Sequence, residues 1–182
     1  INKRAGRKLG PSIVVSLFLL ALIWFALAYE RVIFAGLVTA AVILGLREMR
    51  MALSTSNIAI SFKALTLASL GLGYASWVGG VAGLAIATAI AFPCLLIWLL
   101  REGPEQFVAK ATATSLALIY LPFLAGFIIL LARPSNGLAQ VMTFVVLVGC
   151  NDTFGYIVGV LIGKHPMAPK ISPKKRSQNR GT

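Results

Sequence analysis

Six apolar stretches of about 20 residues each dominate the chain and restrict what it can fold into. A helix needs about 20 mostly apolar residues to cross the ~30 Å hydrocarbon core of a membrane. Hydrophobic residues make up 58% of the sequence, charged residues 12%, and the mean hydropathy is +0.88, which leaves too little polar surface to enclose a soluble core. We therefore predict an all-α, polytopic membrane protein with about six transmembrane helices, at 12–29, 32–53, 58–78, 81–100, 111–131 and 138–162.

Short joints of turn-forming or charged residues separate these stretches. Tyr29-Glu30-Arg31 is a charged hairpin tip, Gly79-Gly80 is a tight turn, and the loop at 101–105 contains a helix-breaking Gly-Pro pair. The loop at 133–137 is also built of turn residues. The ends of 32–53 and 58–78 are the hardest to place, because charged residues shorten their apolar lengths: Arg47, Glu48, Arg50 and Lys63.

Lys and Arg residues are strongly biased toward alternate joints. Of the 17 Lys and Arg residues, only Arg31 and Arg133 fall on one side of the predicted membrane. Under the positive-inside rule the other side is cytoplasmic, and it holds both the N-terminus and the C-terminal tail. We expect a basic cytoplasmic N-terminus at 1–11, a transmembrane helical bundle at 12–162 and a basic cytoplasmic tail at 163–182.

Asp152, the only aspartate of the chain, lies inside the last apolar stretch. Leaving an ionised carboxylate in hydrocarbon costs at least ~2.5–3.5 kcal/mol, so such a residue is a functional-site candidate by default. In a helix Gly159 and Gly163 share its face, which predicts that the carboxylate faces protein or a cavity open to the cytoplasm. There Asp152 could bind Mg²⁺, with Asn151 and Thr153 as oxygen donors. The alternative is a neutral or hydrogen-bonded Asp152 that joins two helices.

The glycines near Asp152 imitate a nucleotide-binding loop. The stretch from Gly159 to His165 has three residues between its glycines where a Walker A loop needs four, and His165 replaces the Ser or Thr that would bind magnesium. Gly155, Gly159 and Gly163 recur every four residues, which is typical of closely packed membrane helices. We therefore interpret them as a packing face.

The tail after residue 163 is rich in lysine and contains no acidic residue. Prolines at 166, 169 and 173 restrict its backbone and favour a shaped loop that holds Lys170, Lys174 and Lys175 toward a nucleoside triphosphate or a phospholipid phosphate. An alternative is a solvated face that binds anionic headgroups. Nucleic acid is not an expected partner, because no aromatic residues are interleaved to stack on bases.

One motif joins the end of the last apolar stretch to this tail. It comprises Asp152-Thr153-Phe154-Gly155-Tyr156, Gly159, Gly163-Lys164, Ala168-Pro169-Lys170 and Ile171-Ser172-Pro173-Lys174-Lys175. These residues closely resemble the phosphatidate cytidylyltransferase (CDP-diacylglycerol synthase) family of bacterial membranes. The strong resemblance covers about 25 residues, and the preceding stretches resemble the family mainly in hydropathy.

The resemblance implies a Mg²⁺-dependent nucleotidyltransferase that makes CDP-diacylglycerol and diphosphate from CTP and phosphatidate, in the inner membrane of a bacterial cell. It implies that Asp152 is the catalytic residue and metal ligand. The implied phosphate-binding residues are Lys164, Lys170, Ser172, Lys174 and Lys175. CTP, phosphatidic acid and membrane lipids are the expected partners, and a homodimer is left open.

The chain also departs from the family pattern. Asn151 stands where the family usually has Ser, and the family's Trp-Glu-Gly and downstream aspartate-rich signature do not follow Lys175. We therefore expect an N-terminal portion that is inactive alone, since Asp152 would be the only carboxylate in the site. Two other functions are weighed, a small ion-coupled transporter that uses Asp152 and a non-catalytic membrane scaffold.

Overall fold

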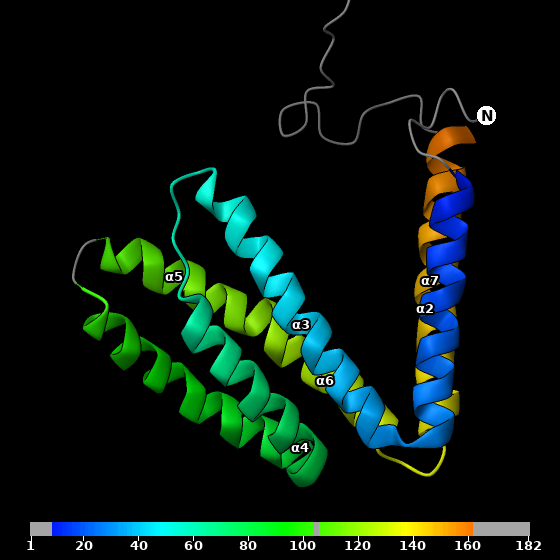
Figure 1. Cartoon of the computed structure of the whole chain (residues 1–182), viewed down its shortest axis with the longest axis horizontal. Coiled ribbons are helices and arrows are strands. Elements are labelled where there is room, and N and C mark those ends of the chain that lie inside the picture. The colour runs from blue at the N-terminus through cyan, green and yellow to red at the C-terminus, as the bar shows by residue number, and fades with distance from the viewer. Residues whose placement is uncertain (1–8, 104–105, 162–182) are drawn as a thin grey trace, which may run out of the picture. The chain divides into compact units, whose positions relative to one another are not determined.

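The computed structural model describes residues 9–103 and 106–161, and this part of the chain is helical without any β-strand. The predicted all-α fold is confirmed. The chain divides into two compact units, Ile1–Met142 and Thr143–Thr182, which we describe separately. In Figure 1 the helices follow one another through short connections. Their bounds are α2 Leu9–Tyr29, α3 Arg31–Ser54, α4 Phe62–Arg101, α5 Phe107–Leu118, the π-helical turn η1 Ile119–Phe123, α6 Leu124–Ala132 and α7 Gly137–Leu161.

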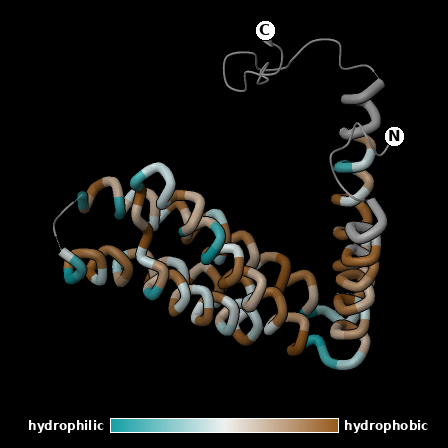
Figure 2. Tube along the Cα trace, turned by 45° about the horizontal axis from the view of Figure 1, so that its top comes forward, coloured by the Kyte–Doolittle hydropathy of each residue, from teal (hydrophilic) through white to brown (hydrophobic). Residues whose placement is uncertain are grey.

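Four helical segments in the described part of the chain are long and apolar enough to cross a membrane. They are Arg31–Ser54, Phe62–Arg101, Phe107–Ala132 and Gly137–Gly155, and a shorter apolar segment covers Leu17–Tyr29. Figure 2 shows hydrophobic residues along the helices and hydrophilic residues concentrated near their ends and joints. The chain is therefore a helical membrane protein, while the number of crossings stays a prediction.

The 40 residues of α4 form two arms that fold back on each other at Gly80. Gly80 has φ 65° and ψ −147°, a conformation that side chains with a Cβ rarely adopt. Three residues further on, a Cβ at Gly83 would overlap the carbonyl of Ala75 in the first arm, so the two arms approach closely here. The turn predicted at Gly79-Gly80 is thus confirmed. The two predicted stretches on either side of it, 58–78 and 81–100, correspond to the two arms of α4.

Two predicted boundaries differ from the observed ones for local reasons. The first arm of α4 begins at Phe62 instead of 58, because Asn57 has a left-handed φ of 57° and Ser61 has the extended conformation of an N-cap residue. The stretch predicted at 111–131 extends over Phe107–Ala132, and its helix widens to η1 around Pro122. A π-helical turn relaxes the backbone where proline cannot donate its hydrogen bond.

The first unit has one continuous hydrophobic core. Leucines from α3, both arms of α4 and α5 are fully buried in it: Leu46, Leu65, Leu72, Leu84, Leu99 and Leu118. Many large apolar side chains outside this core are exposed, for example Val108 at 76%. In a membrane protein such side chains can face lipid without the hydration cost that they would have in water.

Two arginines, Arg31 and Arg133, connect the helix joints at the end of the first unit that the sequence predicts to lie on the non-cytoplasmic side. The Arg31 guanidinium donates to the carbonyls of Arg133, Pro134 and Ser135 at 3.3, 2.6 and 2.9 Å. Arg133 in turn donates to the carbonyl of Val78, beside the α4 turn, at 3.2 Å. Both cations therefore bind backbone carbonyls at the joints, where the chain leaves the regular helices.

Candidate functional site

Asp152 lies in α7, which continues as a helix through the first part of the motif, up to Leu161. The residues from Asn151 to Gly155 are all exposed in this unit. The Thr153 hydroxyl donates to the carbonyl of Gly149 at 2.7 Å, one turn earlier in the same helix. The Asp152 carboxylate is therefore available to an outside partner, as a ligand or catalytic group would need to be.

The helix limits how the three predicted metal ligands can act together. Successive residues of an α-helix are rotated by about 100°, so Asn151 and Thr153 leave the helix about 200° apart. Neighbours at one and two positions do not face each other. Asp152 can therefore share an ion with a neighbour only through bridging waters or a substrate oxygen, and the shared set of Asn151, Asp152 and Thr153 stays a prediction.

The donors that the structure describes do not form a complete metal centre. No three His, Cys, Asp or Glu side chains gather in the described ranges. Mg²⁺, however, usually keeps several waters and takes only one or two protein carboxylates in addition to substrate phosphates. Mg²⁺ prefers hard oxygen ligands, so the Asp152 carboxylate could supply one ligand while substrate phosphates and water would supply the others.

The predicted phosphate-binding residues lie outside the described residues. They are Lys164, Lys170, Ser172, Lys174 and Lys175. Gly155 and Gly159 are on α7, while Gly163 lies beyond the described helix. An added Cβ at Gly155 would meet no atom within 4 Å, so the predicted packing face stays a prediction. The structure therefore places Asp152, Asn151 and Thr153 but does not bring them together with the lysines.

A second polar cluster, which the sequence did not indicate, is centred on Glu102 at the C-terminal end of α4. The Ser61 hydroxyl donates to Glu102 Oε1 at 2.6 Å and the Trp98 indole donates to the same oxygen at 2.8 Å, while Lys110 of α5 pairs with Oε2. The backbone N–H of Ser61 donates to the Thr114 hydroxyl at 3.3 Å. This Glu102 cluster connects the start of the first α4 arm, at Ser61, and the end of the second arm, at Glu102, to α5.

The cluster favours an ionised Glu102. Partial burial by itself raises the pKa of this carboxyl, but hydrogen bonds from Lys110, Ser61 and Trp98 and the charge of Lys110 outweigh it, so the pKa lies below its ordinary value. The signal that could have indicated the cluster was the Trp98-Glu102 spacing of four residues. Ser61 is 41 residues away from Glu102, and no local pattern connects them.

The chain matches a known protein family over most of its length. Residues 11–178 match the cytidylyltransferase family, a range that includes every described helix from residue 11 onward and the whole motif from Asp152 to Lys175. The chain belongs to the cytidylyltransferase family. The resemblance seen in the motif is thus confirmed, and it extends over nearly the whole sequence.

Curated relatives of this chain carry a more specific name. A phosphatidate cytidylyltransferase of Mycobacterium bovis is 29% identical over 188 residues, covering 96% of this chain and 61% of the relative. The protein of the same name from Mycobacterium leprae is 29% identical over 192 residues, covering 94% and 60%. The chain therefore spans about three fifths of the length of these relatives. No solved structure matches it.

Proposed function

We propose that this cytidylyltransferase acts on phosphatidate and makes CDP-diacylglycerol in the inner membrane of a bacterial cell. The observation that carries the proposal is the family match over residues 11–178, which includes the Asp152 motif. The phosphatidate cytidylyltransferases of mycobacteria align with 94–96% of the chain and support the choice of CTP and phosphatidate as substrates. The apolar helices supply the membrane setting that a lipid substrate requires.

The proposed reaction is a nucleotidyl transfer, in which CMP passes from CTP to the lipid phosphate without a protein nucleophile. An oxygen of the phosphatidate phosphate forms a bond to the α-phosphorus of CTP, and the bond from that phosphorus to the oxygen bridging to the β-phosphate breaks. The electron pair leaves with diphosphate, and the lipid phosphate becomes part of the new diphosphate bridge. Such chemistry depends on positioning and charge neutralisation.

In this proposal Asp152 is the catalytic carboxylate that fixes a metal-bound triphosphate. Mg²⁺, when bound, would neutralise charge on the triphosphate and on the departing diphosphate. Lys164, Lys170, Lys174 and Lys175 would contribute cationic contacts to the phosphates, and Ser172 a hydroxyl donor. Asn151 and Thr153 would orient waters or substrate oxygens beside Asp152, since the helix directs them away from each other.

The proposed membrane arrangement places the N-terminus and the lysine-rich tail in the cytoplasm, where CTP is present. The charge bias of the sequence supports it, since Arg31 and Arg133 are the only basic residues assigned to the other side. A homodimer is part of the proposal as an assembly to be tested by mass in detergent. Cysteines placed at 3 and 178, in a chain with Cys94 and Cys150 replaced by serine, should react only with reagents that enter the cell.

Genetic complementation tests the proposed function. The complete gene is expressed in a bacterium whose own phosphatidate cytidylyltransferase can be switched off. We expect growth to be restored and phosphatidate not to accumulate in the membrane lipids. Failure to restore growth with the protein present in the membrane would contradict the proposal, and cation flux in protein-containing liposomes would favour a transporter.

A further inference from the structure

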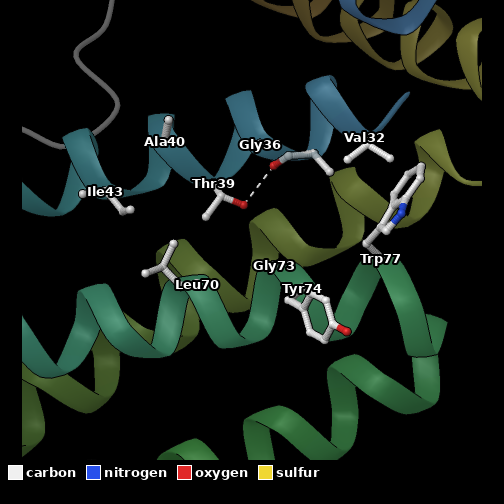
Figure 3. A pocket seen from close by; sticks show the side chains of 10 residues that line it. Val32, Gly36, Thr39, Ala40, Ile43, Leu70, Gly73, Tyr74 and Trp77 are labelled. Atoms are coloured by element: carbon white, nitrogen blue, oxygen red, sulfur yellow. Dashed lines mark hydrogen bonds between the residues drawn. The ribbon is translucent and has the colours of Figure 1, made fainter. Parts of the chain in front are cut away.

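The face shared by α3 and the first arm of α4 carries a groove with a volume of about 340 Å³. This size lies in the range of about 300–1,000 Å³ that is usual for ligand pockets. Figure 3 shows the groove between the two helices, with Leu70 of α4 directed toward α3 and the Trp77 ring standing near Val32. All of its lining residues belong to the first unit, away from the Asp152 motif in sequence.

Small residues hollow out this groove, and its floor is closed. Gly36 and Ala40 of α3 are exposed along it, and an added Cβ at Gly36 would meet no atom within 4 Å. Beneath it, Gly73 touches Thr39 so closely that a Cβ there would overlap the Thr39 hydroxyl. The second, much smaller void under Thr39 and Gly73 measures about 10 Å³, so the groove does not open into the core.

The lining offers almost nothing to a polar ligand. The Thr39 hydroxyl donates to the carbonyl of Ala35 at 2.9 Å within its own helix, as the dashed line in Figure 3 marks. Among the residues that the structure describes, none of those lining the groove is charged. The remaining polar groups are the Tyr74 hydroxyl and the Trp77 indole N–H, which belong to amphipathic rings. The groove is therefore suited to hydrocarbon.

The aromatic rings stand toward one end of the membrane-crossing segments. Val32 is the second residue of α3, and Trp77 lies three residues before the Gly80 turn of α4. Tyr and Trp are enriched at this level of membrane helices because their rings bridge the headgroup region and the acyl chains. A lipid tail lying in the groove would pass these rings where its headgroup begins.

We propose that the groove holds one acyl chain of a bilayer phospholipid, bound through its hydrocarbon independently of the headgroup. Its lining shares no residue with the proposed catalytic motif, and the inference does not depend on the proposed function. A second copy of the chain fits less well, because Tyr74 is 72% exposed at the rim and would obstruct a flat helix-to-helix contact. A flexible acyl chain can bend around such a ring.

Photolabelling in nanodiscs tests the proposal with a matched pair of variants. The probe is phosphatidylcholine with a diazirine in one acyl chain, and labelled peptides are mapped by mass spectrometry. Gly36→Leu fills the groove, whereas Gly71→Leu adds the same side chain to an exposed position of α4 that does not line it and has no atom within 4 Å of its Cβ. We expect Gly36→Leu to reduce labelling of the peptide around Tyr74 about tenfold, which corresponds to about 1.4 kcal/mol, and Gly71→Leu to leave it unchanged.

Further experiments test whether the groove instead binds a lipid headgroup or a second copy of the chain, and whether the variants fold. Ala40→Leu should reproduce the effect of Gly36→Leu, and both variants should keep the wild-type melting temperature. Probes with phosphatidylglycerol or phosphatidate headgroups should label to the same extent. Equal labelling of Gly36→Leu and wild type, labelling by one headgroup alone, or a disulfide between two copies carrying Ala40→Cys would overturn the proposal.

Discussion

The bundle from α3 to α6 and the α7 segment around Asp152 use their side chains in opposite ways. In the bundle, leucines such as Leu99 are fully buried, and the buried polar groups Ser61 and Thr114 are hydrogen-bonded. In α7, Asn151, Asp152 and Thr153 are all exposed. Substitutions in the bundle should therefore change stability, while substitutions at Asp152 should change chemistry. Both units belong to one membrane chain, so the same purified protein can report both effects.

The largest effect is expected for the chain of residues 1–182 assayed by itself. Of its five acidic residues, Glu30, Glu48 and Glu102 lie on other helices or joints, and Glu105 lies outside the described residues. Asp152 is the only carboxylate of the motif. One carboxylate is the smallest protein share that a Mg²⁺ site usually has, so Asp152 by itself should hold the metal only weakly beside two phosphate-bearing substrates. We expect this chain to bind CTP weakly and to form no lipid-linked product from labelled CTP. Robust incorporation of label would show that Asp152 needs no further carboxylate.

The second-largest effect is expected for Asp152→Asn, made in the complete gene product. The amide keeps the shape of the side chain and loses its charge, so we expect activity to fall by about 100-fold or more. The melting temperature should stay within error, because Asp152 is exposed. Glu30→Gln is the matched control, since it makes the same chemical change at another exposed residue, one whose side chain does not cap α3. Near-normal activity of Asp152→Asn would support the helix-joining alternative.

Leu99→Ala tests the bundle side of the comparison. Leu99 is 0% exposed in the core, and removing its side chain should leave a cavity that costs about 2–5 kcal/mol of unfolding free energy. Thermal or denaturant unfolding in detergent micelles measures the change. Leu100→Ala, at a neighbouring position that is 60% exposed, is the control and should cost far less. Equal losses from the two variants would show that the core assignment is wrong.

Glu102→Gln should have a smaller effect, about 1 kcal/mol, because the pair with Lys110 is partly exposed while the hydrogen bonds from Ser61 and Trp98 can persist to an amide oxygen. The pKa of Glu102 is lowered in the folded protein, so its contribution is complete above the ordinary pKa of 4.5 and is lost as the pH falls through the lowered value. Stability should therefore fall more steeply below pH 4.5 in wild type than in Glu102→Gln. Parallel pH profiles would contradict the role of the cluster.

The sequence predicted the parts of this fold that depend on neighbouring residues. Apolar length placed the helices to within a few residues, and Gly79-Gly80 marked the α4 turn, because helix formation and turn geometry are local properties. The start of α4 at Phe62 was missed, since Ser61 is fixed by Glu102 and Thr114 from distant parts of the chain. Such long-range hydrogen bonds leave no periodic pattern.

The sequence predicted the candidate site less completely than it predicted the fold. Asp152 stood out because a lone carboxylate in an apolar stretch needs a physical reason, and the family match confirms the motif that contains it. The predicted ligands Asn151 and Thr153 came from adjacency in sequence, and the continuous helix of α7 shows why adjacency is a poor guide to a shared ion. The groove beside Thr39 depends on the packing of two helices and had no counterpart in the sequence argument.

Direct measurement of product formation tests the central proposal, which is that this member of the cytidylyltransferase family transfers CMP to phosphatidate. The complete gene product is purified in detergent and given phosphatidate, Mg²⁺ and CTP labelled at the α-phosphorus, and lipid and diphosphate are quantified together. We predict equal molar amounts of CDP-diacylglycerol and diphosphate, with no lipid-soluble label when diacylglycerol replaces phosphatidate or when Asp152→Asn replaces wild type. Label transfer to diacylglycerol, or the absence of lipid-linked label from wild type that is folded and bound to CTP, would contradict the account.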